Sequence, residues 1–319
     1  MIEVKNLTKR YGDHLAVDHL NFTVESGKIY GFLGPNGAGK STTMNIMTGY
    51  LGATEGQVLI DGHDILKEPE EAKKNIGYLP EIPPLYMEMT VREYLEFAAE
   101  LKGIKKDKRE PQIEEVIRLA KLRDVENRLI QNLSKGYKQR VGLAQAVLGF
   151  PEIIILDEPT VGLDPKQIIE IRELIRKLAK KHTVILSSHI LAEVREVCDY
   201  IMIISGGKLV ASDTTENLEN MMSGKGQIEV EAKASRDEMD HIIRRTGKIK
   251  EVKYRTSASG ITTAQIIAKG GGDIREELFL AFSHADVPML TLNQSKTTLE
   301  EIFLELTQGS GNRMIKEEK

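Results

Sequence analysis

Hydrophobic and polar positions change their pattern near residue 222, which divides the chain into two parts. In the first part, apolar runs at 29–33, 153–156 and 184–186 have no polar face. Runs of this kind are typical of parallel strands that helices cover on both sides. Leu20, Phe22 and Val24 alternate with polar residues instead, as in a strand with one buried face. Residues 1–222 are therefore predicted to form one α/β domain.

The first part also contains residues that are typical of helix N-termini. Thr90 precedes a helix to about residue 101, and Glu93 stands three residues later, which completes a capping box. Ser134 can cap a helix that ends near residue 148. Between these two helices we expect a third over 111–122. A helical subdomain is thus predicted at about 84–150.

The second part has a different order of elements. Residues 223–226, Ser-Gly-Lys-Gly, are interpreted as a linker. The elements that follow have the order βαββαβ with one extra helix, and this order resembles a ferredoxin-like sandwich. We expect a small α+β domain over 227–307 and a loose polar tail over 308–319. The predicted elements are strand 227–232, helix 235–246, strands 249–256 and 261–269, helix 273–284, strand 286–292 and helix 297–307.

Composition narrows the classes to which the chain can belong. Its 319 residues allow two domains, and 40% hydrophobic with 29% charged residues is ordinary for a globular protein. A net charge of −4 gives no sign of a nucleic-acid partner. Cys198 is the only cysteine, so no intrachain disulfide can form, and a reducing cytosol is the expected setting. No apolar run approaches the roughly 20 residues of a membrane span.

The strongest chemical signal is a glycine-rich stretch between a predicted strand and a predicted helix. Glycines let successive backbone N–H groups point inward, and the N-terminus of a helix favours an anion. Lys40 can reach the β- and γ-phosphates of a nucleotide, and the Ser41 hydroxyl can ligate Mg²⁺. The alternative is a glycine-rich turn with a solvated lysine, but the flanking strand and helix favour a nucleoside triphosphate. This phosphate loop consists of Gly34, Pro35, Asn36, Gly37, Ala38, Gly39, Lys40, Ser41 and Thr42.

Three polar residues follow other predicted parallel strands. Asp157 and Glu158 end the run 153–156, and His189 ends the strand over 183–189. The carboxyl ends of parallel strands lie at one edge of a sheet, so these side chains are expected beside the phosphate loop. Asp157 suits a Mg²⁺ ligand, and Glu158 suits a general base for the attacking water. The alternatives are solvated acids and a structural histidine, which the paired strand pattern disfavours.

Tyr11 and two further histidines each allow a functional and an ordinary structural interpretation. Tyr11 precedes a turn, where it could stack on an adenine, although an ordinary turn tyrosine is the simpler interpretation of the residues alone. His241 and His284 in the second part have no partners at metal-ligand spacing, so we interpret them as surface or packing residues.

Over residues 2–220, the chain resembles the ABC-type ATPases, which belong to the P-loop NTPases. The resemblance implies ATP and Mg²⁺ as ligands and phosphate contacts for the whole loop, with Lys40 taking part in catalysis. It also implies that Tyr11 stacks on adenine, that Glu158 is the catalytic base and that His189 contacts the γ-phosphate. The matching elements, in order, are 34–41, 133–137, 153–158, 162–164 and His189.

The resemblance further implies that two copies pack head to tail around ATP. Ser134 and Gly136 of one copy would then meet the γ-phosphate held by the other. The usual Leu-Ser-Gly-Gly-Gln appears here with Lys135 and Tyr137 in place of a glycine and the glutamine. Glu81 stands where the family has a glutamine, and its carboxylate could still ligate Mg²⁺ or a water.

These features favour the ATPase subunit of an ABC transporter whose multi-span permease is a separate chain. Such a subunit would be cytoplasmic and peripheral on the inner face of the cell membrane. Residues 83–89 are either the dock for that permease or a buried core loop. Residues 295–303 resemble the C-terminal segment of two-component exporter ATPases, which favours export. The alternatives are a soluble ABC-type ATPase that acts on nucleic acid or ribosomes, and a P-loop kinase.

Overall fold

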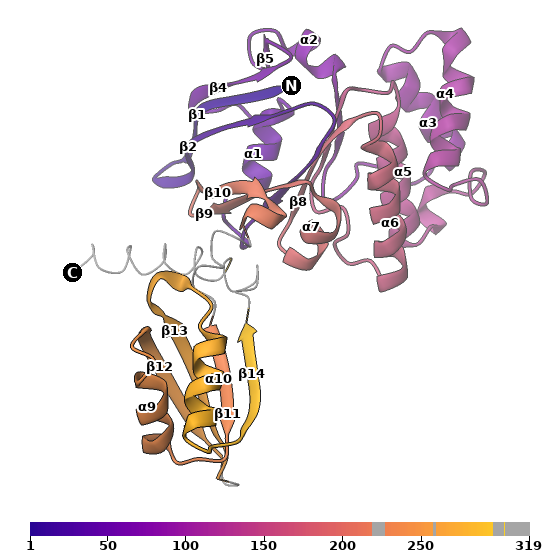
Figure 1. The fold of residues 1–319 in the computed structure, drawn as a ribbon. Coiled ribbons are helices and arrows are strands. Elements are labelled where there is room, and N and C mark those ends of the chain that lie inside the picture. The colour runs from indigo at the N-terminus through magenta and orange to yellow at the C-terminus, as the bar shows by residue number, and fades with distance from the viewer. Residues whose placement is uncertain (219–226, 258–259, 296–302, 304–319) are drawn as a thin grey trace. The chain divides into compact units, whose positions relative to one another are not determined.

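In the computed structural model, the chain divides into two compact units (Figure 1). The structure describes residues 1–218, 227–257, 260–295 and 303. Residues Met1–Thr215 belong to the first unit, and the described residues of Glu216–Glu305 belong to the second. No helix among the described residues is both long and apolar enough to cross a membrane.

The first unit contains an antiparallel sheet of four strands. Leu20 and Val24 are buried and Phe22 is partly buried, whereas Asn21 and Thr23 between them are exposed, as the alternation predicted. The strand order is β2 (His14–Val24), β1 (Ile2–Tyr11), β4 (Glu55–Ile60) and β5 (His63–Asp64).

The second sheet of the first unit contains the strands that precede the phosphate loop and the predicted catalytic residues. All neighbouring strands from β9 to β6 are parallel, and only β10 runs antiparallel at one edge. Strands β3, β7 and β8 are buried along their whole length, which confirms the interpretation of their apolar runs. The order is β10 (Lys208–Thr214), β9 (Tyr200–Ser205), β3 (Ile29–Leu33), β8 (Thr183–Ser188), β7 (Ile153–Leu156) and β6 (Ile76–Leu79).

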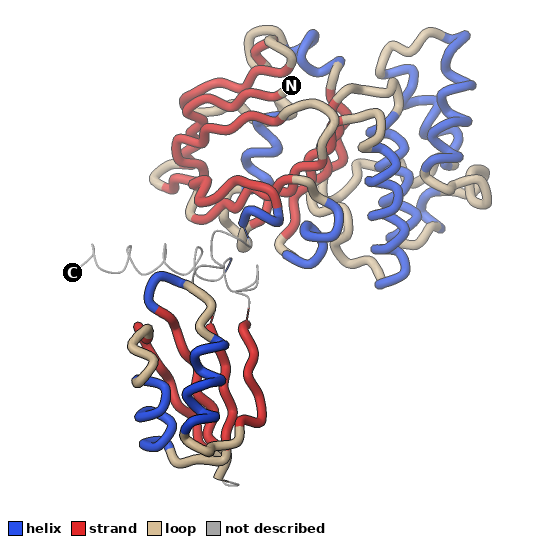
Figure 2. The backbone as a smooth tube through the Cα atoms, viewed as in Figure 1, coloured by secondary structure: helices blue, strands red, loops and turns tan. Residues whose placement is uncertain are grey.

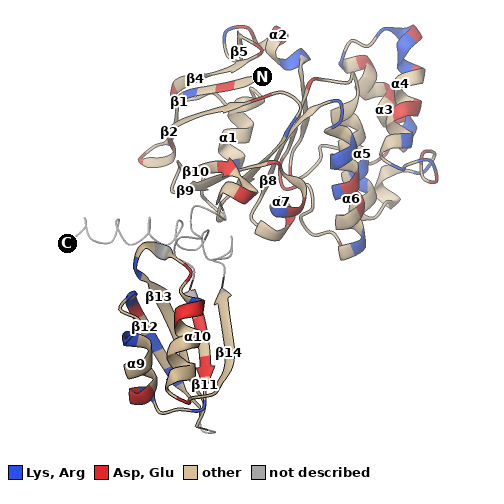
Figure 3. Cartoon of the chain, viewed as in Figure 1, with Lys and Arg blue, Asp and Glu red and all other residues tan. Residues whose placement is uncertain are grey.

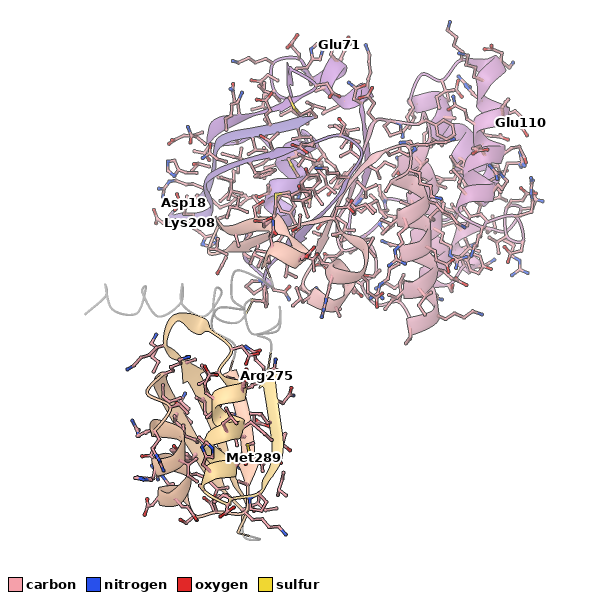
Figure 4. The ribbon with its side chains drawn as sticks, viewed as in Figure 1. Asp18, Glu71, Glu110, Lys208, Arg275 and Met289 are labelled. Carbon is pink, nitrogen blue, oxygen red and sulfur yellow. The ribbon has the colours of Figure 1, made fainter. Side chains whose placement is uncertain are left out.

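Helix α1 (Lys40–Met47) shares one hydrophobic core with both sheets (Figure 2). Its Met44, Ile46 and Met47 are fully buried beside residues of β1, β3 and β7. The edges of the two sheets are also joined by an ion pair, because Lys208 Nζ on β10 lies 3.1 Å from Asp18 Oδ2 on β2 (Figure 4). The phosphate loop therefore enters a helix whose position is set by packing on both sides.

Helices gather between β6 and β7 in sequence. Thr90 and Glu93 form the predicted capping box at the start of α3. Basic and acidic residues are interspersed along α3 and α4 (Figure 3). Arg92 of α3 pairs with Glu110 of α4 and with Glu126 in the segment after α4. After α1, the first unit contains α2 (Pro69–Lys74), α3 (Val91–Leu101), α4 (Lys106–Leu119), the 3₁₀ turn η1 (Ile130–Asn132), α5 (Lys135–Val147), α6 (Pro165–Leu178) and α7 (Leu191–Val197).

One helix boundary was predicted wrongly. We expected a helix over 111–122, but α4 begins at Lys106, and Pro111 lies inside it. Proline is common in the first turn of a helix, but Pro111 lies beyond the first turn of α4. Buried Ile113, Val116 and Ile117 hold the helix in place, and this tertiary packing outweighs the local proline preference.

The second unit is an antiparallel sheet with two helices whose apolar sides share its core. Its strand order is β12–β13–β11–β14, and the order of elements along the chain is βαββαβ as expected. The last strand occupies Met289–Ser295 rather than 286–292, because Asp286 adopts a positive φ in a turn after α10. The bounds are β11 (Gln227–Ala232), α9 (Arg236–Arg244), β12 (Ile249–Thr256), β13 (Thr262–Ala268), η2 (Lys269–Gly271), α10 (Arg275–His284) and β14 (Met289–Ser295).

Several predictions concern residues outside those that the structure describes. These are the linker at 223–226, the tail at 308–319 and, apart from Phe303, the helix at 297–307.

Candidate functional site

The phosphate loop joins the end of β3 to the start of α1, as predicted. A Cβ atom at Gly34 would lie 2.3 Å from the backbone oxygen of Ile204, so only glycine lets the loop pass β9. Gly39 has a φ of 104°, in the left-handed region that favours glycine. The backbone of this loop therefore depends on these two glycines.

Lys40 is folded into the loop that precedes it. Its Nζ donates hydrogen bonds to the carbonyl oxygens of Gly34 at 2.9 Å and Pro35 at 3.3 Å. The same ammonium lies 3.6 Å from Glu158 Oε1, and the side chain is only 6% exposed. A buried cation needs such partners. Phosphate oxygens could replace them, since they are stronger acceptors than carbonyl oxygens.

Asp157 lies beside the phosphate loop and directly follows the end of β7. Its Oδ1 accepts hydrogen bonds from Ser41 Oγ at 3.2 Å and from Ser187 Oγ at 2.5 Å. Ser187 also accepts a bond from the backbone N–H of Glu158 at 2.8 Å. The end of β8 thus orients both residues that follow β7. Ser187 was missed in the sequence, although a hydroxyl at the end of a buried strand was a visible signal.

Glu158 has an unusual backbone conformation for a residue with a side chain. Its φ is 47°, in the left-handed region, which costs of order 1–3 kcal/mol. Its Oε2 lies 2.9 Å from His189 Nδ1, and its Oε1 faces Lys40. The carboxylate is nearly buried and therefore sits between one ammonium and one imidazole.

One cleft of about 460 Å³ gathers most of the predicted site. Tyr11 is 49% exposed at its rim, and Lys9 Nζ lies 5.3 Å from the centroid of its ring. Residues from five separate stretches of sequence thus meet in one place. The lining residues that were predicted are Tyr11, Asn36, Gly37, Gly39, Lys40, Ser41, Thr42, Glu81, Glu158 and His189.

Six predicted site residues do not line this cleft. Four of them belong to the phosphate loop or lie beside it, namely Gly34, Pro35, Ala38 and Asp157, and the other two are Ser134 and Gly136 of a separate segment. Ser134 caps α5 by accepting the N–H of Tyr137, as expected. Gly136 packs against α6, since a Cβ there would lie 2.5 Å from Gln167. The cleft within one chain therefore lacks Ser134 and Gly136, the two residues that were expected to come from a second copy.

Tyr137, which replaces the usual glutamine after Gly136, has a hydrogen-bond partner within the same chain. Tyr137 Oη donates to Asp124 Oδ2 at 2.5 Å, and this hydrogen bond raises the pKa of the phenol. Arg140 lies over the same ring at 5.4 Å from its centroid. Tyr137 thus ties the start of α5 to the segment before it.

A second groove, of about 870 Å³, shares three residues with the phosphate site region. Ser41, Glu81 and Asp157 line it on one side. At its mouth, Tyr50 and Ile82 are each 82% exposed. Exposed apolar side chains next to a groove are typical of an interaction surface.

The donor set fits Mg²⁺ better than a metal held only by protein. Ser41 and Asp157 offer a hydroxyl and a carboxylate at hydrogen-bonding distance from each other. Among the described residues, no group of three or more His, Cys, Asp or Glu side chains could hold a metal. Mg²⁺ takes few protein ligands and completes its shell with water and phosphate oxygens.

Comparison with known proteins identifies relatives across the first unit and across nearly the whole chain. A family model described as ABC transporter matches residues 17–161. The bacitracin transport ATP-binding protein BcrA of Bacillus licheniformis is 43% identical over 221 residues, 69% of this chain and 71% of BcrA. The uncharacterized ABC transporter ATP-binding protein YcbN of Bacillus subtilis (strain 168) is 31% identical over 97% of this chain and 98% of YcbN.

A solved structure has the same fold and the ligands of ATP hydrolysis. It is a dimeric, post-hydrolysis state of the ATP-binding cassette MJ0796 bound to ADP and Pi, which is 28% identical with a TM-score of 0.61. The match covers 67% of this chain and 98% of that chain.

A glycine-rich phosphate loop beside a strand-end carboxylate pair defines a P-loop nucleoside triphosphatase. The chain belongs to the ATP-binding subunits of ABC transporters, and it is an ABC ATPase that hydrolyses ATP for transport. The resemblance inferred from its motifs is thereby confirmed.

Proposed function

We propose that this chain powers an exporter and that Glu158 is the base of its ATPase reaction. The observation that carries the proposal is the arrangement around Glu158, whose carboxylate lies between Lys40 and His189. A carboxylate held between two cationic or polar groups beside a phosphate loop can orient a water and accept its proton. The neighbouring Asp157 is already engaged by Ser41 and Ser187, which leaves Glu158 for this role.

The other residues of the cleft receive roles that follow from their chemistry. Lys40 exchanges its two carbonyl acceptors for oxygens of the β- and γ-phosphates, and the loop N–H groups bind the remaining oxygens. His189 donates to the γ-phosphate and holds the water near Glu158. Ser41 and Asp157, with Glu81 directly or through water, would hold Mg²⁺. That ion would neutralise charge on the phosphates.

The proposal includes a homodimer, because one chain supplies only part of the site. Ser134 caps α5 but lies outside the cleft lining, so its helix N-terminus is available for the phosphate of a second copy. The related cassette MJ0796 was solved as a dimer with ADP and Pi. Two head-to-tail copies would each complete the site of the other.

The proposed membrane partner is a separate multi-span permease on the cytoplasmic side of the cell membrane. The groove with exposed Tyr50 and Ile82 and the neighbouring residues 83–89 is the proposed dock. Export is favoured by the similarity to BcrA, which is named for bacitracin transport. The segment 295–303, which suggested export in the sequence, lies mostly outside the described residues.

This assignment is tested by purifying the tagged chain from its native membranes. We expect a multi-span protein to co-purify and ATPase activity to release free phosphate. A soluble homodimer without such a partner would contradict the transporter subunit, and a phosphorylated small molecule as product would indicate a kinase.

We further propose that the second unit is a ferredoxin-like domain over 227–307, after a first domain at 1–222 with a helical subdomain at about 84–150. Support comes from the βαββαβ order and from the strand order β12–β13–β11–β14, in which the first and third strands along the chain are central and the second and fourth are at the edges, as that fold requires.

Replacing Tyr11 by alanine is expected to raise the KM for ATP by about tenfold and leave kcat nearly unchanged. Stacking of a base on an aromatic ring contributes about 1–3 kcal/mol, and the half-exposed ring offers such a face at the cleft. Steady-state ATPase kinetics measure the effect, with Tyr11→Phe as the matched control. An unchanged KM for ATP in Tyr11→Ala would show that Tyr11 does not stack on the adenine and is an ordinary turn tyrosine.

Replacing Glu81 by glutamine is expected to change ATP turnover by less than about threefold. An amide oxygen can ligate Mg²⁺ or a water as a carboxylate oxygen does, and Glu81 lines both the cleft and the groove. The comparison is made with Glu88→Gln, an exposed carboxylate on the same connection. A loss of two orders of magnitude or more would instead assign the carboxylate itself a specific role.

A further inference from the structure

A buried carboxylate behind the cleft has no assigned part in the reaction. Glu193 lies in the first turn of α7, is 7% exposed and does not line the cleft. Among the described residues, no lysine, arginine or histidine forms an ion pair with it within 4.0 Å. A buried charge without a cation is costly unless hydrogen bonds satisfy it.

Two hydroxyl groups supply those hydrogen bonds, and both donate to the same oxygen. Glu193 Oε2 accepts from Thr160 Oγ1 at 2.6 Å and from Ser188 Oγ at 3.1 Å. Both hydroxyl-bearing residues are themselves nearly fully buried. Hydrogen bonds to an ionised acceptor are shorter and stronger than neutral ones, so this oxygen holds both partners firmly.

The two partners lie next to the proposed catalytic side chains, Thr160 in the loop after β7 and Ser188 as the last residue of β8. Thr160 is the second residue after Glu158, in a turn where Val161 N donates to Glu158 O at 3.1 Å. Ser188 directly precedes His189, and its Oγ also accepts the N–H of Ile190 at 3.0 Å. One carboxylate oxygen therefore joins the loop after β7 to the end of β8, directly before His189.

We propose that Glu193 is a positioning residue that sets His189 against Glu158. This inference rests on the proposed roles of those two residues. The separation of 2.9 Å between His189 Nδ1 and Glu158 Oε2 depends on how the segments after β7 and β8 are held together, and Ser187 in β8 also links to the residues that follow β7. Ser187 fixes Asp157 and the backbone of Glu158, whereas Glu193 fixes the second residue after Glu158 and the residue directly before His189.

The strained backbone of Glu158 makes such a clamp necessary. A residue held at a φ of 47° relaxes unless the surrounding structure determines its conformation. The turn after Glu158 is tied to α7 through Thr160, so the left-handed conformation is held from both sides. Without Glu193, the carboxylate of Glu158 would be free to leave His189 while the phosphate loop stays intact.

The test compares two replacements of Glu193 in the full chain. Glu193→Leu fills a similar volume without an acceptor, and Glu193→Gln keeps one oxygen that can accept both hydroxyls. We expect the leucine variant to lose about tenfold or more in kcat with KM for ATP within about threefold, as for an interaction that matters only in the transition state. The glutamine variant is expected to retain kcat within about threefold.

A matched control separates positioning from stability. Asp64 is also a buried carboxylate of the first unit, accepts the backbone N–H of Leu66 at 2.9 Å and lies outside the cleft lining. Asp64→Leu is expected to lower the midpoint of thermal unfolding without lowering kcat. If both leucine variants lose kcat in proportion to stability, Glu193 is only structural and the proposal is wrong.

A double variant tests whether Glu193 acts through His189. Adding Glu193→Leu to His189→Ala should cost less than about twofold beyond the single His189 variant, because residues that act as a unit are not additive. Full additivity would overturn the proposal. If the leucine variant does not fold, Thr160→Val, which removes one donor with little change in volume, takes its place in the same comparison.

The outcomes also separate this inference from the proposed function. Glu158→Gln alone tests the base, and normal turnover in that variant would end the proposed mechanism whatever Glu193 does. Loss of turnover in Glu158→Gln together with full turnover in Glu193→Leu would leave the base assigned and remove only the positioning role.

Discussion

Replacing Glu158 by glutamine is expected to lower ATP hydrolysis by about 10² or more while ATP still binds. Glutamine keeps the shape of the side chain and can still contact Lys40 and His189, but it cannot accept a proton from water. The nucleotide would therefore remain between two copies, and the dimer should persist. Phosphate release measures turnover, and light scattering with and without ATP measures the dimer.

The matched control for this prediction is Glu152→Gln, which changes an exposed carboxylate just before β7. It removes the same charge near the same strand but lies at the opposite end from the cleft. We expect wild-type turnover in the control. Normal turnover in Glu158→Gln would show that another group accepts the proton, and a monomer with ATP would argue against the sandwich dimer.

Replacing Lys40 by alanine is expected to weaken ATP binding by about 10² or more, because hydrogen bonds to charged groups contribute about 1.5–3 kcal/mol each. The ammonium is already buried at the loop and aimed at its carbonyl oxygens, so it needs little rearrangement to meet phosphates. Removal also leaves Glu158 without its nearest cation. Calorimetric titration with ATP measures the loss directly.

Exposed Lys180, just after α6, offers the control for this second prediction. Lys180→Ala makes the same change in net charge but is expected to bind ATP as the wild type does. The change in binding can then be assigned to position rather than to charge. ATP affinity within about threefold of wild type in Lys40→Ala would contradict the phosphate role of this lysine.

Much of the candidate site could be predicted because its signals are local. Gly34 and Gly39 are required by backbone geometry, Ser134 and Thr90 by the unpaired N–H groups at helix starts. Asp157 follows an apolar run that is buried on both faces. Each of these features depends on residues within one turn or one strand, so the order of amino acids is enough to reveal it.

Other parts depended on partners far away in the chain. The start of α4 was misjudged because its buried face outweighs Pro111, and β14 was displaced by a turn at Asp286. The Lys40–Glu158–His189 arrangement joins three separate stretches. No pattern within a single stretch reports the distance between them.

The class of protein could therefore be predicted from the sequence alone, because the phosphate loop and the strand-end carboxylates are short, contiguous motifs. Only folding revealed how Glu158 is held. Its left-handed backbone, the bridging hydroxyl of Ser187 and the buried oxygen of Glu193 arise where the loop after β7 meets the end of β8 and the start of α7. Each of these contacts is buried, and polar groups removed from water need hydrogen-bond partners. Those partners are distant in sequence and become neighbours only when the sheet forms.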